Sequence, residues 1–172
     1  MERRFFLIAT LSAFVCGCGA LAQPMSSGEF RTAVKGSSFA TTETFDIDRP
    51  YAQVVETLRT KANECLAVVA TSSGPVFQGN TMVTEHSRAE YKPTISASGE
   101  RLELAVQVDF GEHTMIQKLP PGGMYILVAD AVPAGKGTKL TIYRGKLGKA
   151  TEIGGAIRQW SMGKSSACPD LK

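Results

Sequence analysis

Apolar and polar residues alternate in several short stretches of this chain, and the alternation predicts β-strands. The clearest stretch is RLELAVQVDF, residues 101–110, in which every second residue from Leu102 to Phe110 is apolar. A period of two places these side chains on one face of a strand and mostly polar side chains on the other. Three further strand candidates lie at residues 41–47, 122–131 and 137–145, and weaker ones at 67–73 and 80–91.

Two other stretches repeat their apolar residues every three or four positions, which predicts helices. In residues 48–66 the repeated positions are Tyr51, Val54, Leu58, Ala62 and Cys65. In residues 150–163 they are Ile153, Ile157 and Trp160. Each helix must bury its apolar face, and the sheet is the only large partner available. We therefore expect both helices on the same face of the sheet.

The elements follow one another in the order strand, helix, several strands, helix. The later strands are joined by short turns rich in Gly and Pro, such as residues 133–137. This order predicts an α+β domain in which an antiparallel sheet of about five strands carries two helices on one face. Gly154 and Gly155 interrupt the second helical pattern. Either another group approaches the helix backbone closely there, or the helix begins only after Gly155.

Both ends of this domain carry a resemblance to a known architecture. FDIDRPYAQVVETL, residues 45–58, gives an opening strand and a helix, and a closing helix surrounds Trp160. Together they resemble the helix-grip architecture of START and Bet v 1-like domains, in which a curved antiparallel sheet wraps a long C-terminal helix. The resemblance implies a pocket for a small apolar ligand between sheet and helix. The residues expected to line it are Val106, Val108, Ile126 and Trp160.

This domain is shorter than the helix-grip pattern, and no second helix is evident after the first. We therefore prefer a compact relative with a filled core to one with a large cavity.

The start of the chain, residues 1–22, has the layout of an export signal. Arg3 and Arg4 precede an apolar run over residues 5–15. The run is shorter than the roughly 20 residues that a bilayer-spanning helix needs, so it predicts export of a bacterial protein and not a membrane anchor.

Two cleavage positions compete. Ala20 and Ala22 fit an A-x-A site, which would release a soluble periplasmic protein beginning at Gln23. VCGC, residues 15–18, instead resembles the lipobox of bacterial lipoproteins, with Cys18 as the residue to be acylated. We prefer the lipoprotein hypothesis and keep the soluble product as its alternative.

By the lipoprotein resemblance, Gly19 after the acylated cysteine implies the outer membrane, facing the periplasm. Residues 23–40 have scattered apolar positions and Ser/Gly pairs, a composition typical of a flexible tether. Residues 41–172 then form one α+β domain, long enough to bury a core without a metal.

The remaining cysteines, Cys65 and Cys168, belong to the folded domain. In an oxidising compartment they most simply form a disulfide with each other. A reactive thiol or a metal pair is the alternative, but the domain has no C-x-x-C spacing. Because Cys65 ends the first helix and Cys168 follows the last one, we expect the C-terminal ends of both helices to be adjacent.

The net charge of +3 is modest, and no run of basic residues calls for a nucleic acid. The late part of the chain is locally basic through Lys136, Lys139, Arg144, Lys146 and Lys149. These residues fit either a solvated strand edge or a patch that meets anionic lipid headgroups or an acidic partner.

No catalytic constellation is recognisable. The two histidines, His86 and His113, each follow a Glu. Neighbours on a strand point to opposite faces, so neither pair can act together on one substrate. Zinc needs three or four ligands at recognised spacings, so we expect no metal and no cofactor.

The sequence therefore predicts a non-catalytic bacterial cell-envelope protein that acts as a binding or scaffolding module in the periplasm. The alternative is a periplasmic carrier of a small apolar ligand in a helix-grip pocket, and an enzyme ranks third.

Overall fold

A computed structural model describes residues 23–111, 119–165 and 167–172, and within them the chain forms one six-stranded sheet and three helices. The elements are α1 (Ser27–Lys35), β1 (Ala40–Ile47), α2 (Tyr51–Cys65), β2 (Val69–Gln78), β3 (Thr81–Ser98), β4 (Arg101–Asp109), β5 (Met124–Ala134), β6 (Gly137–Gly145) and α3 (Lys149–Ser161). The sheet is antiparallel throughout, in the order β1-β6-β5-β4-β3-β2. The α+β class is confirmed. The expected five strands become six, because both weaker candidates are strands.

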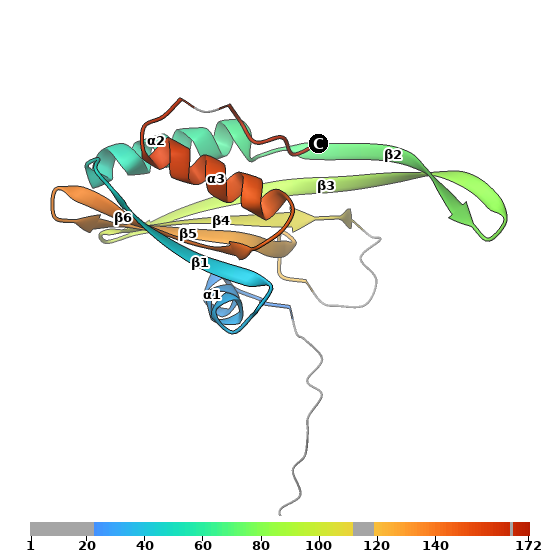
Figure 1. Cartoon of the computed structure of the whole chain (residues 1–172), viewed down its shortest axis with the longest axis horizontal. Helices are drawn as coiled ribbons and strands as arrows, with labels where there is room; N and C mark the ends of the chain where they lie inside the picture. The colour runs from blue at the N-terminus through green and yellow to red at the C-terminus, as the bar shows by residue number, and fades with distance from the viewer. Residues whose placement is uncertain (1–22, 112–118, 166) are drawn as a thin grey trace, which may run out of the picture.

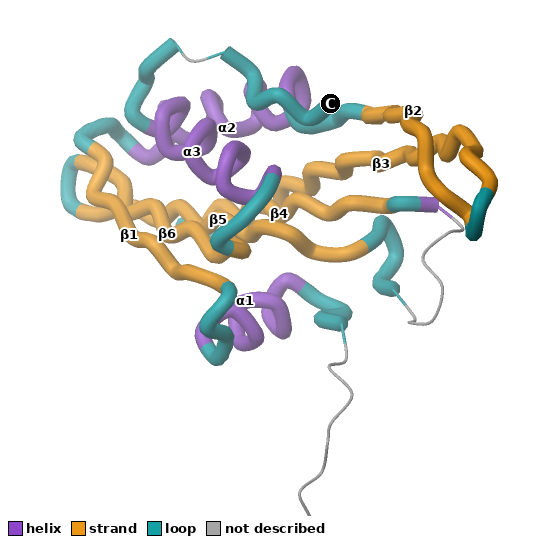
Figure 2. The backbone as a smooth tube through the Cα atoms, turned by 45° about the vertical axis from the view of Figure 1, so that its right-hand side comes forward, coloured by secondary structure: helices purple, strands orange, loops and turns teal. Residues whose placement is uncertain are grey.

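The helices cover the sheet on two sides. Figure 1 and Figure 2 show α2 and α3 together on one face, as the sequence predicted, and α1 on the opposite face. The domain therefore has three layers: α1, the sheet, and the pair α2 and α3. The apolar pattern did not predict the layer formed by α1.

The main core lies between the sheet and the pair α2 and α3. The predicted apolar face of α2 is buried at Val54, Leu58, Ala62 and Cys65. On α3, Ile153 and Ile157 are fully buried and Trp160 is 1% exposed. Alternate residues of the inner strands meet them; those fully buried are Leu102, Leu104, Val106, Leu127 and Leu140. Burial of each such side chain contributes about 1.5–3 kcal/mol.

Helix α1 corrects the prediction of a flexible tether over residues 23–40. Its N-cap, Ser26, accepts a hydrogen bond from the backbone N–H of Glu29 at 3.2 Å. The carboxylate of Glu29 accepts one in return from the backbone N–H of Met25 at 2.8 Å. This is close to a capping box, which satisfies N–H groups that the first helical turn leaves free. The signal was present in the sequence as Ser26 followed three residues later by Glu29.

Two apolar residues one turn apart fix α1 to the sheet. Phe30 and Val34 are buried and pack with Ala105 and Val128 on the face opposite the main core. The ring centroids of Phe30 and Tyr125 lie 6.1 Å apart. Strands β4 and β5 are therefore covered on both faces, which explains their long apolar runs.

The disulfide between Cys65 and Cys168 is present, with 5.1 Å between their Cα atoms. The expected placement of the helix ends is wrong, however. Arg49, just before α2, donates to the carbonyl oxygens of Trp160 and Ser161 at 3.0 and 3.1 Å. The C-terminal end of α3 thus lies at the start of α2, and the helices run in opposite directions.

The chain after α3 must therefore return along α2 to reach Cys65 (Figure 1). The first residues after α3 turn back on the helix, since the backbone N–H of Lys164 donates to the carbonyl of Gln159 at 3.0 Å. The disulfide then fixes the chain end to Cys65, the last residue of α2.

Residues 1–22, with Cys18 and both cleavage positions, lie outside the described residues. Among the described helices, none combines the length and apolar character needed to cross a bilayer.

The two glycines of α3 yield a matched pair of predictions. A Cβ at Gly154 would lie 2.8 Å from Cδ of Arg144, whereas one at Gly155 meets nothing within 4 Å. Arg144 is held by Glu43 at 2.8 Å and by Thr151 at 3.0 Å. We expect Gly155→Ala to raise the free energy of unfolding by about 0.5–1 kcal/mol through helix propensity. Gly154→Ala should lower it, because Arg144 must leave its partners.

Urea unfolding of both variants measures the difference. Equal stabilisation by the two substitutions would contradict the close approach of Arg144 to the α3 backbone.

Candidate functional site

The four residues expected to line a helix-grip pocket do not share a cavity. The exposed fractions of Val106, Val108 and Trp160 are 0, 2 and 1%. A side chain beside a ligand-sized space would expose surface to that space, so these three belong to a filled core. Ile126 packs partly against the same core but lines a different pocket. The indole N–H of Trp160 is buried with no acceptor among the described residues.

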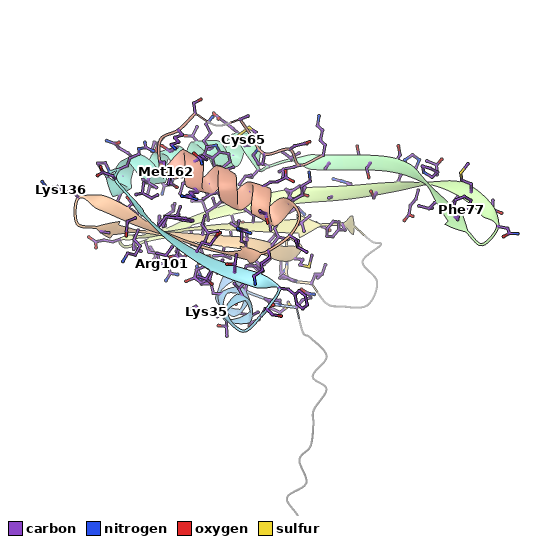
Figure 3. All side chains as sticks on the ribbon, in the orientation of Figure 1. Lys35, Cys65, Phe77, Arg101, Lys136 and Met162 are labelled. Carbon is purple, nitrogen blue, oxygen red and sulfur yellow. A yellow bond between two sulfur atoms is a disulfide. The ribbon has the colours of Figure 1, made fainter. Side chains whose placement is uncertain are left out.

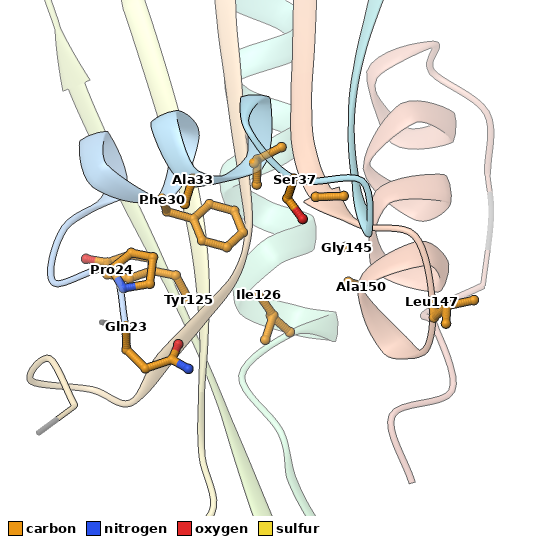
Figure 4. Close-up of a pocket in the computed structure, with 12 residues that line it drawn as sticks. Gln23, Pro24, Phe30, Ala33, Ser37, Tyr125, Ile126, Gly145, Leu147 and Ala150 are labelled. Carbon is orange, nitrogen blue, oxygen red and sulfur yellow. The ribbon is translucent and has the colours of Figure 1, made fainter. Parts of the chain in front are cut away.

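The pocket that contains Ile126 lies where α1 meets the start of β5, the end of β6 and the start of α3 (Figure 4). Its volume is about 340 Å³. The lining residues are Gln23, Pro24, Phe30, Ala33, Val34, Ser37, Ala40, Tyr125, Ile126, Gly145, Leu147 and Ala150. None of them carries a charge, so the pocket suits an apolar group. We call it the α1 pocket.

A charged network holds α1, and with it one wall of the α1 pocket, on the sheet. The guanidinium of Arg31 pairs with Asp130 at 2.6 Å and also with Glu103. Arg101 reaches the second oxygen of Asp130 at 2.5 Å. Burial tends to lower the pKa of Arg31, but the hydrogen bonds to Asp130 and Glu103 outweigh burial and raise it above its ordinary value. Asp130 is thus shared by two cations while its side chain is 8% exposed.

The second feature is a two-stranded arm that projects from the sheet. Strand β3 pairs with β2 over Thr81 to Glu90 but with β4 only from Glu90 onward. Among the described strands, none pairs with the outer half of the hairpin on its second side, and Figure 3 shows Phe77 near its far end. We call residues 71–88 the arm. An isolated two-stranded hairpin is marginally stable in water, so the arm stands out as a structure without its own core.

The end of the arm is apolar. Phe77 is 77% exposed and Met82 64%, and the two lie directly opposite each other. Val76 and Val83 form the next pair and point to the other face. The apolar pattern predicted a strand over residues 80–91 but did not predict this exposed tip. Gly79 in the turn, with a φ of 64°, between two apolar pairs was the available signal.

The outer edge of the arm carries no charge. Strand β2, the last in the sheet, has no Asp, Glu, Lys or Arg in its ten residues. At the opposite edge, β1 carries Glu43 and Asp46. Natural edge strands are commonly protected by charged residues. Among the described residues, Pro75 interrupts this edge, and the C-terminal Leu171 and Lys172 lie beside its first part at residues 70–72 (Figure 1). The part of the β2 edge beyond residue 72 leaves backbone groups open to pairing.

Tyr91 marks the junction between arm and body. Its backbone N–H donates to the carbonyl of Val68 at 2.8 Å, and the side chain is buried at 8% exposure. Burial, and then the charge of Glu152, raises the pKa of Tyr91 above its ordinary value. The arm is therefore anchored at its base by a packed aromatic residue.

The histidines do not assemble a site among the described residues. His86 lies exposed on the arm opposite Ser73, while His113 falls outside the described residues. No group of three or more potential metal ligands occurs in the described part of the chain.

The basic residues also separate. Lys136 lies at the far end of the molecule from Phe77 (Figure 3). Arg144 is paired with Glu43, whereas Lys146 lies beside the α1 pocket.

Comparison with known proteins adds little to this geometry. No family model matches the chain, and no curated protein matches it. Among solved structures, Ara h 8.0201, a Bet v 1-like protein, shares 13% identity at a TM-score of 0.37, covering 72% of this chain and 95% of its own. Protein CV1439 from Chromobacterium violaceum shares 11% identity at a TM-score of 0.35, covering 74% and 94%.

A STAR-related lipid transfer protein from Xanthomonas axonopodis shares 13% identity at a TM-score of 0.31, covering 73% of this chain and 80% of its own. At these TM-scores the similar structures carry no information on the function of this chain. Its α+β architecture is defined by its own strand order and helix packing.

The charged network under α1 generates a stability prediction. Asp130→Ala would leave Arg31 short of one carboxylate in a largely buried setting. We expect a loss of about 2–3 kcal/mol in the free energy of unfolding, because the largely buried guanidinium of Arg31 loses a carboxylate partner. Glu64→Ala is the matched control. It breaks a pair with Lys61 in which the side chains are 37 and 54% exposed, so it should cost less than about 1 kcal/mol.

Urea unfolding measures both variants, and amide exchange in residues 27–35 reports whether α1 detaches. Equal losses for the two variants would show that the network does not hold α1 in place.

Proposed function

We propose that this protein is a non-catalytic binding module of the bacterial cell envelope. The export signal and the lipobox-like VCGC support exposure to the periplasm, with acylated Cys18 attaching the chain to the outer membrane. A soluble periplasmic form beginning at Gln23 is the alternative. The proposed partner is another envelope protein.

The arm is the observation that carries this proposal. The two-stranded ribbon packs little against the other described residues, yet its end presents exposed Phe77 and Met82 beside half-buried Val76 and Val83. Exposed apolar residues at the end of a projecting element are suited to insertion into a groove of a partner. A partner that covers the arm would supply the packing that an isolated two-stranded hairpin lacks.

The uncharged edge of β2 indicates how the partner binds. An extended segment of another protein can add to a free sheet edge, where backbone hydrogen bonds supply affinity and side-chain pockets supply specificity. Over β2 the edge offers ten residues without a charge. We propose that the partner contributes such a segment along β2, with Phe77 filling a pocket beside it.

The charged side chains of two clusters form ion pairs within the fold, which supports the hypothesis of a non-catalytic protein. Asp130 and Glu103 neutralise Arg31, and Glu43 neutralises Arg144. His86 lies on the arm with Ser73 opposite. The clusters around Arg31 and Arg144 thus act in fixing α1 and the β1 edge of the sheet.

A small-ligand carrier is the second candidate, and the α1 pocket favours it. Its uncharged lining and volume of about 340 Å³ suit a small apolar ligand. The site would differ from a helix-grip pocket, because it lies against α1 and not under α3.

The arm yields the first test. A photoreactive phenylalanine analogue in place of Phe77 should form one discrete protein adduct in living cells. The same analogue in place of Lys136, at the other end of the molecule, should form none. Phe77→Ser combined with Met82→Ser should lower the affinity for that partner by at least about 10-fold, as expected for two central apolar contacts. The melting temperature should not change, because both side chains are largely exposed.

Equal adducts from positions 77 and 136 would contradict a binding role for the arm. An adduct at twice the mass of the chain would assign the arm to self-association, against the proposed envelope partner.

The anchor yields the second test. We expect the intact mass of the denatured protein from envelopes to correspond to a chain that begins at Cys18 and carries acyl groups. Cys18→Ser should abolish the added mass and release the protein from membranes or leave it unprocessed. A wild-type mass matching an unmodified chain that begins at Gln23 would end the lipoprotein hypothesis.

A further inference from the structure

Phe39 and Leu147 are the two most exposed large apolar side chains in the described residues, each at 83%. They lie close together, because the backbone N–H of Lys146 donates to the carbonyl of Phe39 at 3.0 Å. The backbone there is fixed by pairing while both side chains point away from the core. Neither residue belongs to the arm.

Two lysines lie near these side chains along the sequence, Lys146 directly before Leu147 and Lys35 four residues before Phe39. Lys146 donates to the carbonyl of Ser38 at 2.8 Å, and Lys35 lies in the last turn of α1, with its Nζ 5.8 Å from the ring centre of Tyr143. The ion pairs found among the described residues include no carboxylate partner for either lysine.

The described carboxylates of α1, β1 and the first turn of α3 include ones that are already engaged, such as Glu29, which accepts from the backbone N–H of Met25. Glu43 pairs with Arg144 at 2.8 Å, and Glu152 lies 3.6 Å from Lys149. The local surface is therefore cationic around an apolar centre.

We propose that Phe39, Leu147, Lys35 and Lys146, here called the docking corner, contact the surface of an anionic lipid bilayer. The two apolar side chains enter the interface and the two lysines meet lipid phosphates. Apolar insertion combined with cationic attraction is the usual chemistry of peripheral membrane binding.

The position of the first described residues supports a lipid bilayer as the surface that contacts the docking corner. Gln23 and Pro24 line the α1 pocket together with Leu147. Five peptide units separate Cys18 from Gln23 and span at most about 18 Å. If Cys18 is acylated, as proposed above, Gln23 is held within that distance of the membrane, and the docking corner lies across the α1 pocket from it. The exposure and the charge of the corner do not depend on that modification.

The chain offers a clean fluorescent test. It contains one tryptophan, Trp160, which is 1% exposed and so cannot enter a bilayer. Leu147→Trp adds a reporter at the corner, and Phe77→Trp adds a matched reporter on the arm. Protein processed and purified from cells is mixed with vesicles of phosphatidylcholine and 30% phosphatidylglycerol, whose acyl chains carry bromine as a quencher.

We expect the brominated vesicles to quench Leu147→Trp, because a side chain inserted about 5–10 Å into the interface comes near the acyl chains. The wild type and Phe77→Trp should stay unquenched. Adding Lys35→Gln and Lys146→Gln to Leu147→Trp should weaken docking by about 25-fold, given about fivefold for each lysine. Omitting phosphatidylglycerol should weaken it similarly.

Absence of quenching in Leu147→Trp would overturn the proposal, whether the protein binds the vesicles or not. Quenching that is indifferent to both lysines and to phosphatidylglycerol would overturn it as well, since anionic lipid would then play no part. Quenching of Phe77→Trp alone would assign the membrane contact to the arm, and so contradict both this proposal and the proposed function. Failure at Leu147 with Phe77 unquenched would leave the proposed function untouched.

Discussion

The covering of strands β4 and β5 on both faces is the constraint on which the rest of the structure depends. One face meets α2 and α3 and the other meets α1 through Phe30 and Val34. Because α1 also carries Arg31, packing of α1 on the sheet places this guanidinium over the strands. Asp130 and Glu103 neutralise its charge there. Removal of α1 would expose both an apolar patch and a carboxylate pair. The segment before the first strand is therefore part of the fold.

The same covering determines which surfaces remain available. Three short helices cover the sheet's body but cannot reach the outer half of β2 and β3, which continues as the arm. At another corner, the turns that connect α1 to β1 and β6 to α3 leave Phe39 and Leu147 outside. The protein thus presents two separate apolar surfaces, one proposed for a protein partner and one for the membrane. Their separation allows a membrane-held module to keep its arm free.

The sequence predicted the strands and helices whose apolar residues repeat regularly. It did not predict the short helix α1 or the exposed apolar surfaces. Val54, Leu58 and Trp160 recur at helical spacing and are buried as expected, and Cys65 and Cys168 are bonded. Helix α1 was missed because its three apolar residues, Phe30, Ala33 and Val34, span little more than one turn and so give too short a repeat, although its capping residues were visible. The direction of α3 and the filling of the expected pocket depend on three-dimensional packing. The tip at Phe77 and the corner at Phe39 are recognisable only once neighbouring strands are placed.

Native mass spectrometry of the protein purified from its own cells tests the central claim most directly, namely that this chain works through its surface and not as a carrier. Spectra of the native and the denatured protein are compared for one preparation. We predict the same mass in both, that of the mature chain with any covalent acyl groups. A stoichiometric apolar molecule that is present in the native spectrum and lost on denaturation would contradict the claim and favour a carrier that uses the α1 pocket.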